Sequence, residues 1–185
     1  MGTIKTTNIE PIADNGTVTL GSSGDTFTLG SGVKQSNLNY PAFEAYLSSS
    51  QSVTNSSNVK AQINTEVFDT DNAYDNSTNY RFTPQVAGKY FVYGAIRGYA
   101  GNNNDLDRVR AMIYKNGSEY RQSMSDSGST STAHIDTEQV SAIIDFNGSS
   151  DYVELYGLVE ADDGSGAEFN DGTKSNYFGA YRIGS

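Results

Sequence analysis

The sequence predicts an all-β fold, an antiparallel sandwich or jelly roll made of many short strands. Three observations support this class: apolar and polar residues alternate along several segments, turn signals rich in Gly and Asn separate these segments, and no segment has a convincing helical period. The chain contains 13 Tyr, 8 Phe and 19 Gly yet is only 36% apolar, which favours short strands and long turns over packed helices. Strand, turn and strand at this spacing are typical of a sandwich or jelly roll.

Residues 1–38 differ from the rest and are expected to form a separate N-terminal segment. The sequence TVTLGS at 17–22 returns nine residues later as TFTLGS at 26–31. Each copy predicts a short alternating strand that ends in a Gly-Ser turn. Because two such units cannot bury an apolar face alone, we expect a stalk or docking segment in which several chains intertwine. The alternative is an ordinary hairpin packed on the domain that residues 39–185 form.

Residues 59–68 predict an alternating strand. Its apolar side is expected to hold Val59, Ala61, Ile63, Thr65 and Val67. Its polar side is expected to hold Lys60, Gln62, Asn64 and Glu66. Such a strand has one face in the core and the other in water.

Two further strand pairs follow. Residues 107–115 place Val109, Ala111 and Ile113 on one face, and Asn116-Gly117 then supplies the two positive-φ residues of a tight hairpin turn before a returning strand at 118–124. A strand at 138–146 leads through the turn at 147–150 into a strand at 151–158. The first pair predicts a hairpin, and the second predicts two strands joined by a turn.

The charge of the chain limits its partners. A net charge of −10 and an isoelectric point near 4.4 argue against nucleic acid, because a protein that binds phosphate backbones needs clustered Lys and Arg. No apolar run approaches the roughly 20 residues of a spanning helix, so we expect no membrane insertion. The chain has no cysteine, and neither disulfides nor thiolate metal sites contribute.

The sequence selects no catalytic residue. Its one histidine, His134, lies in a Ser/Thr-rich segment, and no Gly-x-Ser-x-Gly elbow accompanies it. We expect His134 to be an exposed or structural residue. Carboxylates could form a glycosidase pair, but spacing along the chain does not select two of them. We therefore predict a protein that is not an enzyme, with an enzyme that degrades host polysaccharide as an alternative.

Two acidic loops carry the oxygen donors that calcium prefers. One spans residues 160–171 and the other residues 69–76. Neither has the order of an EF-hand loop. Calcium is the one cofactor that the sequence suggests, and a solvated acidic loop is the alternative for each segment. We assign no metal ligand and no cofactor-binding residue.

Five short motifs carry a family resemblance: PAFEAY at 41–46, FTP at 82–84, GKYFV at 88–92, DYVEL at 151–155 and YFGAY at 177–181. With these motifs the chain resembles, over about residues 40–183, the jelly-roll heads of the complement C-one-q and tumour-necrosis-factor-like family. Heads of this family are mostly trimeric binding modules, so the resemblance implies a homotrimer. The repeat in residues 1–38 resembles the fibre-like N-terminal regions of bacteriophage appendage proteins.

The resemblance also implies core positions. They are Phe43, Tyr46, Phe82, Pro84, Tyr90, Val92, Val153 and Leu155, with a turn at Gly88. Gly179 aligns with a glycine of the family, whereas Ala180 stands where phenylalanine is usual. Phe178 or Tyr181 is expected to compensate for that smaller side chain. None of these positions marks a ligand.

These observations predict a non-enzymatic bacteriophage virion protein, located on a surface-exposed appendage of the tail or capsid. Residues 1–38 are expected to dock on neighbouring virion proteins, and residues 39–185 to form the trimeric tip of a tail fibre or spike that binds a host-surface glycan or protein. The Tyr, Asn and Gly content of residues 98–107 suits adaptable contacts, although an ordinary exposed loop has the same composition. The alternative function is a capsid decoration or head-fibre protein.

Overall fold

The computed structural model describes residues 40–101, 105–128 and 133–184, together with the single residues Ile9, Val18, Thr19, Gly21, Thr26 and Ser31. The chain divides into two compact units, Met1–Ser36 and Asn37–Ser185. Most of the repeat at 17–31 lies outside the described residues, so both interpretations of the N-terminal segment stay predictions. The following description concerns the second unit.

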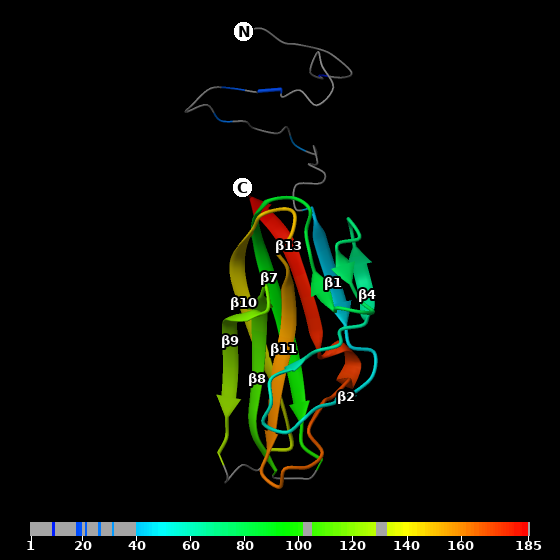
Figure 1. Cartoon of the computed structure of the whole chain (residues 1–185), viewed down its shortest axis with the longest axis vertical. Helices are drawn as coiled ribbons and strands as arrows, with labels where there is room; N and C mark the ends of the chain where they lie inside the picture. The colour runs from blue at the N-terminus through cyan, green and yellow to red at the C-terminus, as the bar shows by residue number, and fades with distance from the viewer. Residues whose placement is uncertain are drawn as a thin grey trace. The chain divides into compact units, whose positions relative to one another are not determined.

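The second unit contains two antiparallel sheets (Figure 1). Sheet A holds, in neighbouring order, β10 (Ile135–Phe146), β7 (Gly88–Tyr99), β13 (Tyr177–Gly184), β1 (Ala42–Tyr46) and β4 (Thr65–Asp69), with β12 (Glu168–Phe169) also beside β7 and β2 (Gln51–Ser52) beside β12. Sheet B holds β9 (Ser118–Asp126), β8 (Leu106–Lys115), β11 (Val153–Ala161), β6 (Arg81–Phe82) and β5 (Tyr74–Asp75), with β3 (Val59–Lys60) beside β11. This arrangement confirms the predicted all-β antiparallel jelly roll.

Helical structure is minor in the described residues. A short 3₁₀ segment, η1 (Gly172–Lys174), precedes β13. No helix in these parts of the chain is long and apolar enough to cross a membrane.

The core between the sheets is built around stacked aromatic rings. The Phe43 ring lies 4.4 Å from the Tyr74 ring and 4.5 Å from the Phe82 ring, measured between centroids, and Phe178 meets Phe43 edge-on at 5.2 Å. Burying one side chain of this size contributes about 1.5–3 kcal/mol. The predicted inward positions are confirmed for Phe43, Phe82, Pro84, Tyr90, Val92, Val153 and Leu155.

The hairpin predicted at Asn116-Gly117 is confirmed. Asn116 and Gly117 adopt positive φ angles of 52° and 79° between β8 and β9, as a tight turn of this kind requires. β10 and β11 follow in the predicted strand-turn-strand order, and Gly148 has a φ of 70° in the turn between them. The two strands do not pair with each other, because β10 joins β7 in sheet A and β11 joins β8 in sheet B.

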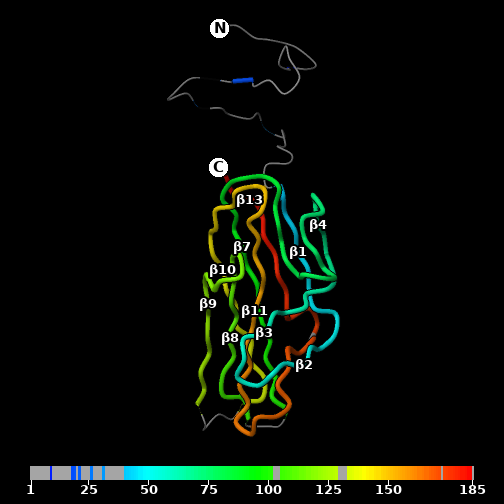
Figure 2. Tube along the Cα trace, viewed as in Figure 1, coloured from blue at the N-terminus to red at the C-terminus, as the bar shows by residue number. Residues whose placement is uncertain are grey.

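The prediction of one strand over residues 59–68 is wrong. Of this segment, only β3 lies in sheet B, where it pairs with β11. The chain then crosses to sheet A, with Ala61 and Ile63 still buried, and pairs with β1 as β4. Figure 2 shows the trace passing from β3 to β4. Val67 is 50% exposed, because β4 is an edge strand and this residue points away from the core. An alternating pattern does not reveal that a segment changes sheets.

Tyr46 was also wrongly predicted as a core residue. Successive strand residues point to opposite faces, so Phe43 and Ala45 enter the core while Glu44 and Tyr46 point outward. In β13 the same alternation buries Phe178 and Ala180 and leaves Tyr181 exposed. Phe178 therefore provides the expected compensation, and Tyr181 does not.

Candidate functional site

The outer face of sheet A carries a cluster of aromatic side chains. We call it the aromatic face and define it by the residues Tyr46, Phe91, Tyr93, Tyr177 and Tyr181. The rings contact one another across β7 and β13: the centroid distances are 5.9 Å for Phe91–Tyr93, 5.6 Å for Phe91–Tyr181 and 6.2 Å for Tyr93–Tyr177. Strand alternation explains the cluster, because every second residue of β7 and β13 must point away from the core.

Strand register places these rings in rows. Phe91 lies opposite Tyr181 on β13 and opposite Ile143 on β10. Tyr177 lies opposite Tyr46 on β1. Each row therefore joins side chains that are far apart in the sequence, and neighbours of this kind are the pairs that stabilise a sheet face.

One residue of β13 interrupts the cover of side chains. Gly179 lies opposite both Tyr93 and Glu44, and a Cβ built on it would lie 2.4 Å from the Tyr93 ring carbon Cζ. The missing side chain lets the phenol extend over β13, where its hydroxyl donates a 2.8 Å hydrogen bond to the Glu44 carboxylate. Burial and this hydrogen bond raise the pKa of Tyr93, so the phenol stays neutral at ordinary pH.

Two hollows flank the ridge formed by Tyr93 and Tyr177. A hollow of about 370 Å³ lies toward β4 and is lined also by Tyr46, Val67, Glu44 and Lys174. Another of about 400 Å³ lies toward β10, beside Gln139 and Ser141. The Lys174 ammonium sits 4.5 Å from the centre of the Tyr46 ring, a cation–π contact. The ridge and the two hollows give the aromatic face an uneven shape to which the surface of a folded partner can be complementary.

Exposed apolar groups extend the aromatic face. Ile143 is 57% exposed beside Phe91, and Tyr181 is 38% exposed. Contiguous exposed apolar surface on a soluble domain marks an interaction site, and tyrosine is enriched where proteins bind one another. The arrangement is suited to binding a protein surface rather than to chemistry on a substrate.

The two acidic loops use their carboxylates within the fold. Asp69 accepts a 2.8 Å hydrogen bond from the Tyr74 backbone N–H, and Asp163 accepts two bonds of 2.8 Å from Ser165. Glu160 forms a 2.8 Å ion pair with Arg108. In the described parts of the chain, no group of three or more His, Asp and Glu side chains is placed to hold a metal ion. Calcium binding stays a prediction.

The other segments noted in the sequence lie at the ends of strands. His134 is exposed, and its ring meets the Tyr99 ring edge-on at 5.8 Å. The loop after β7 contains Asp105, which is buried and accepts a 2.9 Å hydrogen bond from the Asp163 backbone N–H. Residues 102–104 of this loop lie outside the described residues. These segments do not join the aromatic face.

Sequence reasoning missed the aromatic face, although a signal was present. Tyr90 and Val92 were assigned inward, which leaves Phe91 and Tyr93 on the opposite side of the same strand. A strand face that is exposed to water normally carries polar side chains, so two outward aromatic residues on one strand indicate a surface that binds a partner. What the sequence could not show is that β13 lies beside β7 and adds Tyr177 and Tyr181.

Comparison with known proteins supports the fold. No family model matches the sequence, and no curated protein matches it. Among solved structures, the Eiger TNF of S. frugiperda aligns with a TM-score of 0.57 at 10% identity, covering 80% of this chain and 94% of that one. Murine APRIL aligns with a TM-score of 0.53 at 7% identity, covering 77% and 98%. At these identities the similarity establishes the fold alone: the second unit is a TNF-like jelly roll.

Proposed function

We propose that this chain is a non-enzymatic binding protein of a bacteriophage virion, and that its second unit assembles as a homotrimer at the tip of a tail fibre or spike that binds the host surface. The observation that carries the proposal is the aromatic face. A monomer would expose this ridge of rings and its two hollows to water at a cost in free energy.

A second and third copy of the chain are the partners that suit this face. Its charged groups are few and already engaged, since Glu44 accepts the Tyr93 hydrogen bond and Lys174 lies over Tyr46. Burying the face therefore leaves little unpaired charge, which is the main obstacle to a stable interface. The resemblance to a family of mostly trimeric heads supports three copies.

The phage setting rests on the N-terminal segment. Its nine-residue repeat resembles fibre-like regions of phage appendage proteins, and residues 1–38 would tie the head to neighbouring virion proteins. Three heads on one stalk would bind a repetitive host surface with greater avidity than one.

Sedimentation equilibrium of the full-length chain tests the assembly. We expect a species of three times the 19.9 kDa chain mass. The double variant Ile143→Glu/Tyr181→Glu places charge on the aromatic face and should give the monomer. Met124→Glu is the control, because Met124 is 50% exposed, between the values of Ile143 and Tyr181, but lies on sheet B. A wild-type monomer, or a trimer that survives the double variant, would contradict assembly through this face.

Deleting the gene from the phage tests the function. Loss of adsorption with intact capsids is the expected result. Fragile capsids with normal adsorption would instead favour a capsid decoration or head-fibre role. Release of oligosaccharides from host envelope material by the purified protein would contradict a non-enzymatic function.

A further inference from the structure

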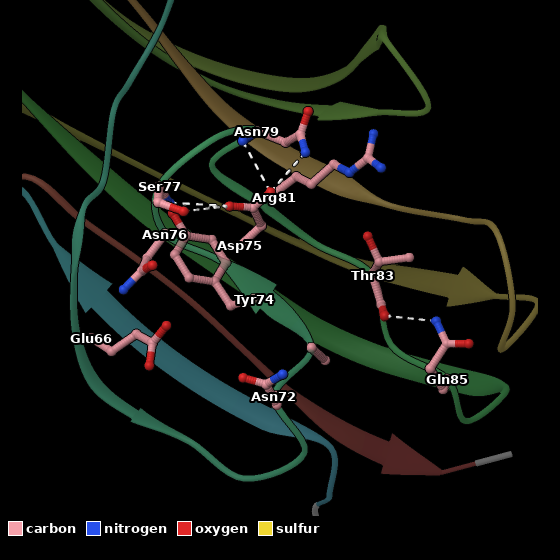
Figure 3. A pocket seen from close by; sticks show the side chains of 11 residues that line it. Glu66, Asn72, Tyr74, Asp75, Asn76, Ser77, Asn79, Arg81, Thr83 and Gln85 are labelled. Atoms are coloured by element: carbon pink, nitrogen blue, oxygen red, sulfur yellow. Dashed lines mark hydrogen bonds between the residues drawn. The ribbon is translucent and has the colours of Figure 1, made fainter.

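A third hollow lies at the edge of the sandwich, away from the aromatic face. It has a volume of about 510 Å³, within the range of small-ligand sites, and lies where the edge strand β4 of sheet A meets the β5–β6 pair at the edge of sheet B (Figure 3). We call it the edge pocket. The side chains that its chemistry depends on are Glu66, Asn76, Asn79, Arg81, Thr83 and Gln85.

The wall of the edge pocket is fixed by contacts within the fold. Tyr74 is buried, its ring stacks on Phe43, and its hydroxyl donates a 2.8 Å hydrogen bond to the Ile63 carbonyl. Asp75 accepts five hydrogen bonds from Ser77, Thr78 and Asn79, at 2.7–3.3 Å, which hold the loop between β5 and β6. A preformed wall lowers the conformational entropy that the protein must lose when a ligand binds. Because the Asp75 carboxylate accepts these five hydrogen bonds, we assign it a structural role in the loop and not a role in ligand binding.

The remaining lining groups define the ligand. Four side-chain amides line the pocket, from Asn72, Asn76, Asn79 and Gln85, and Thr83 adds a hydroxyl. The amide nitrogens of Asn79 and Gln85 already donate within the fold, so these two residues offer chiefly their oxygens as acceptors. Arg81 is the one cation among the described lining residues, and its guanidinium lies 4.6 Å from the centre of the Tyr152 ring. Two carboxylates, Glu66 and Asp75, offset it. A phosphate or sulfate would meet net negative charge here, whereas the hydroxyls of a neutral sugar match amides that accept and donate.

Strand alternation separates the two surfaces. Glu66 lines the edge pocket, whereas its neighbour Val67 lines a hollow of the aromatic face. Neighbouring residues of one strand point to opposite sides. Copies of the chain that associate through the aromatic face would therefore leave Glu66 and the edge pocket open to a ligand.

We propose that the edge pocket binds a neutral sugar unit of a host-surface glycan. The inference rests on the proposed receptor-binding function and names its ligand class and site. Each copy would contribute weak hydrogen-bonded contacts, and three copies would raise the overall affinity.

An array of immobilised neutral, sialylated and phosphorylated oligosaccharides tests the proposal with the full-length protein. We expect binding to a set of neutral glycans. Asn76→Ala and Glu66→Gln should each weaken that binding about three- to tenfold, the loss of one or two hydrogen bonds. Gln62→Ala is the control, because Gln62 is an exposed amide outside the pocket and should leave binding unchanged. All variants should keep the sedimentation mass of the wild type.

Three results would overturn the proposal. They are binding only to anionic glycans, full binding by both pocket variants, and no glycan binding at all. Blocking of phage adsorption by the purified protein separates this proposal from the proposed function. If the purified protein blocks adsorption but binds no glycan on the array, its receptor is of another kind. In that case only the edge-pocket inference fails. A protein that neither blocks adsorption nor retains a glycan contradicts the receptor-binding function as well.

Discussion

The Tyr93 hydroxyl donates a 2.8 Å hydrogen bond to the Glu44 carboxylate, and the phenol reaches that carboxylate by extending over Gly179 on the strand between them. Three neighbouring strands of sheet A thus supply a ring, a gap and an acceptor in one row. The contact fixes the centre of the aromatic face, since Tyr93 also meets Phe91 and Tyr177.

Gly179→Ala should disturb assembly more than folding. The new Cβ would lie 2.4 Å from Tyr93 Cζ, and the phenol would have to swing away from Glu44. A movable side chain yields more easily than backbone, so we expect a loss of about 1 kcal/mol in unfolding free energy, at the low end for overpacking. Sedimentation should show weakened self-association with an unchanged circular dichroism spectrum. A trimer of wild-type affinity would show that the Tyr93 position is unimportant.

Self-association should strengthen with salt. Each chain carries a net charge of −10, so three chains repel one another, while the aromatic face itself is largely uncharged. Salt screens the repulsion and leaves apolar contact intact. Sedimentation across a range of sodium chloride concentrations checks this. Dissociation at high salt would instead point to an interface held by ion pairs.

Lys60→Met should destabilise the fold by about 2–3 kcal/mol. Lys60 Nζ lies 2.5 Å from Glu154 Oε1, and Glu154 is only 4% exposed, so its carboxylate would lose its partner in a buried site. The value is below that of a fully buried pair because Lys60 is partly solvated. Urea unfolding measures the change.

Two further variants control that prediction. Lys89→Met removes a lysine whose 3.5 Å ion pair with Asp145 is exposed, and it should cost under about 1 kcal/mol. Lys60→Met/Glu154→Leu removes both charges of the buried pair and should recover most of the lost stability. Equal effects of Lys60→Met and Lys89→Met would show that burial of Glu154 is unimportant.

Asp75→Asn should destabilise the domain in a pH-dependent manner. Hydrogen bonds from the Thr78 backbone and its neighbours lower the pKa of Asp75 below its ordinary 3.8. A lowered pKa stabilises the folded state above the ordinary value, and that contribution is lost as the pH falls below 3.8 toward the folded-state pKa. At neutral pH we expect a loss of about 1–3 kcal/mol.

Urea unfolding of the Asp75→Asn variant at several pH values measures this loss. Asp71→Asn, at an exposed carboxylate in the preceding turn, is the matched control. The difference between Asp75→Asn and wild type should shrink below about pH 3.8. A constant difference would mean that the charge of Asp75 does not stabilise the loop.

The strands and turns were largely predictable from sequence, because local chemistry determines them. Asn116-Gly117 adopts the positive φ angles that its composition requires, and Val109, Ala111 and Ile113 are buried as their alternation predicts. Val67 was misplaced because a change of sheet between β3 and β4 leaves the local pattern unaltered.

The functional surfaces were less predictable, because each depends on register between distant strands. The aromatic face needs Phe91 beside Tyr181, ninety positions later in the chain. The edge pocket joins Glu66 to the loop that Asp75 organises, and this proximity follows from the two sheet edges meeting. Asp69 and Asp75, in one of the two acidic loops, also accept hydrogen bonds from backbone N–H groups nearby. Such a local role and a calcium site have the same composition, so calcium binding stays a prediction.

The opposite directions of Glu66 and Val67 on β4 would also affect how such a protein changes under selection. If the edge pocket binds a ligand and copies associate through the aromatic face, as proposed, a substitution at Glu66 would alter ligand preference without touching the side of the strand on which copies meet. Host range could then shift by small changes in the loops between β4 and β6 while the oligomer stays constant. The same strand would thus allow rapid adaptation on one side and impose constraint on the other.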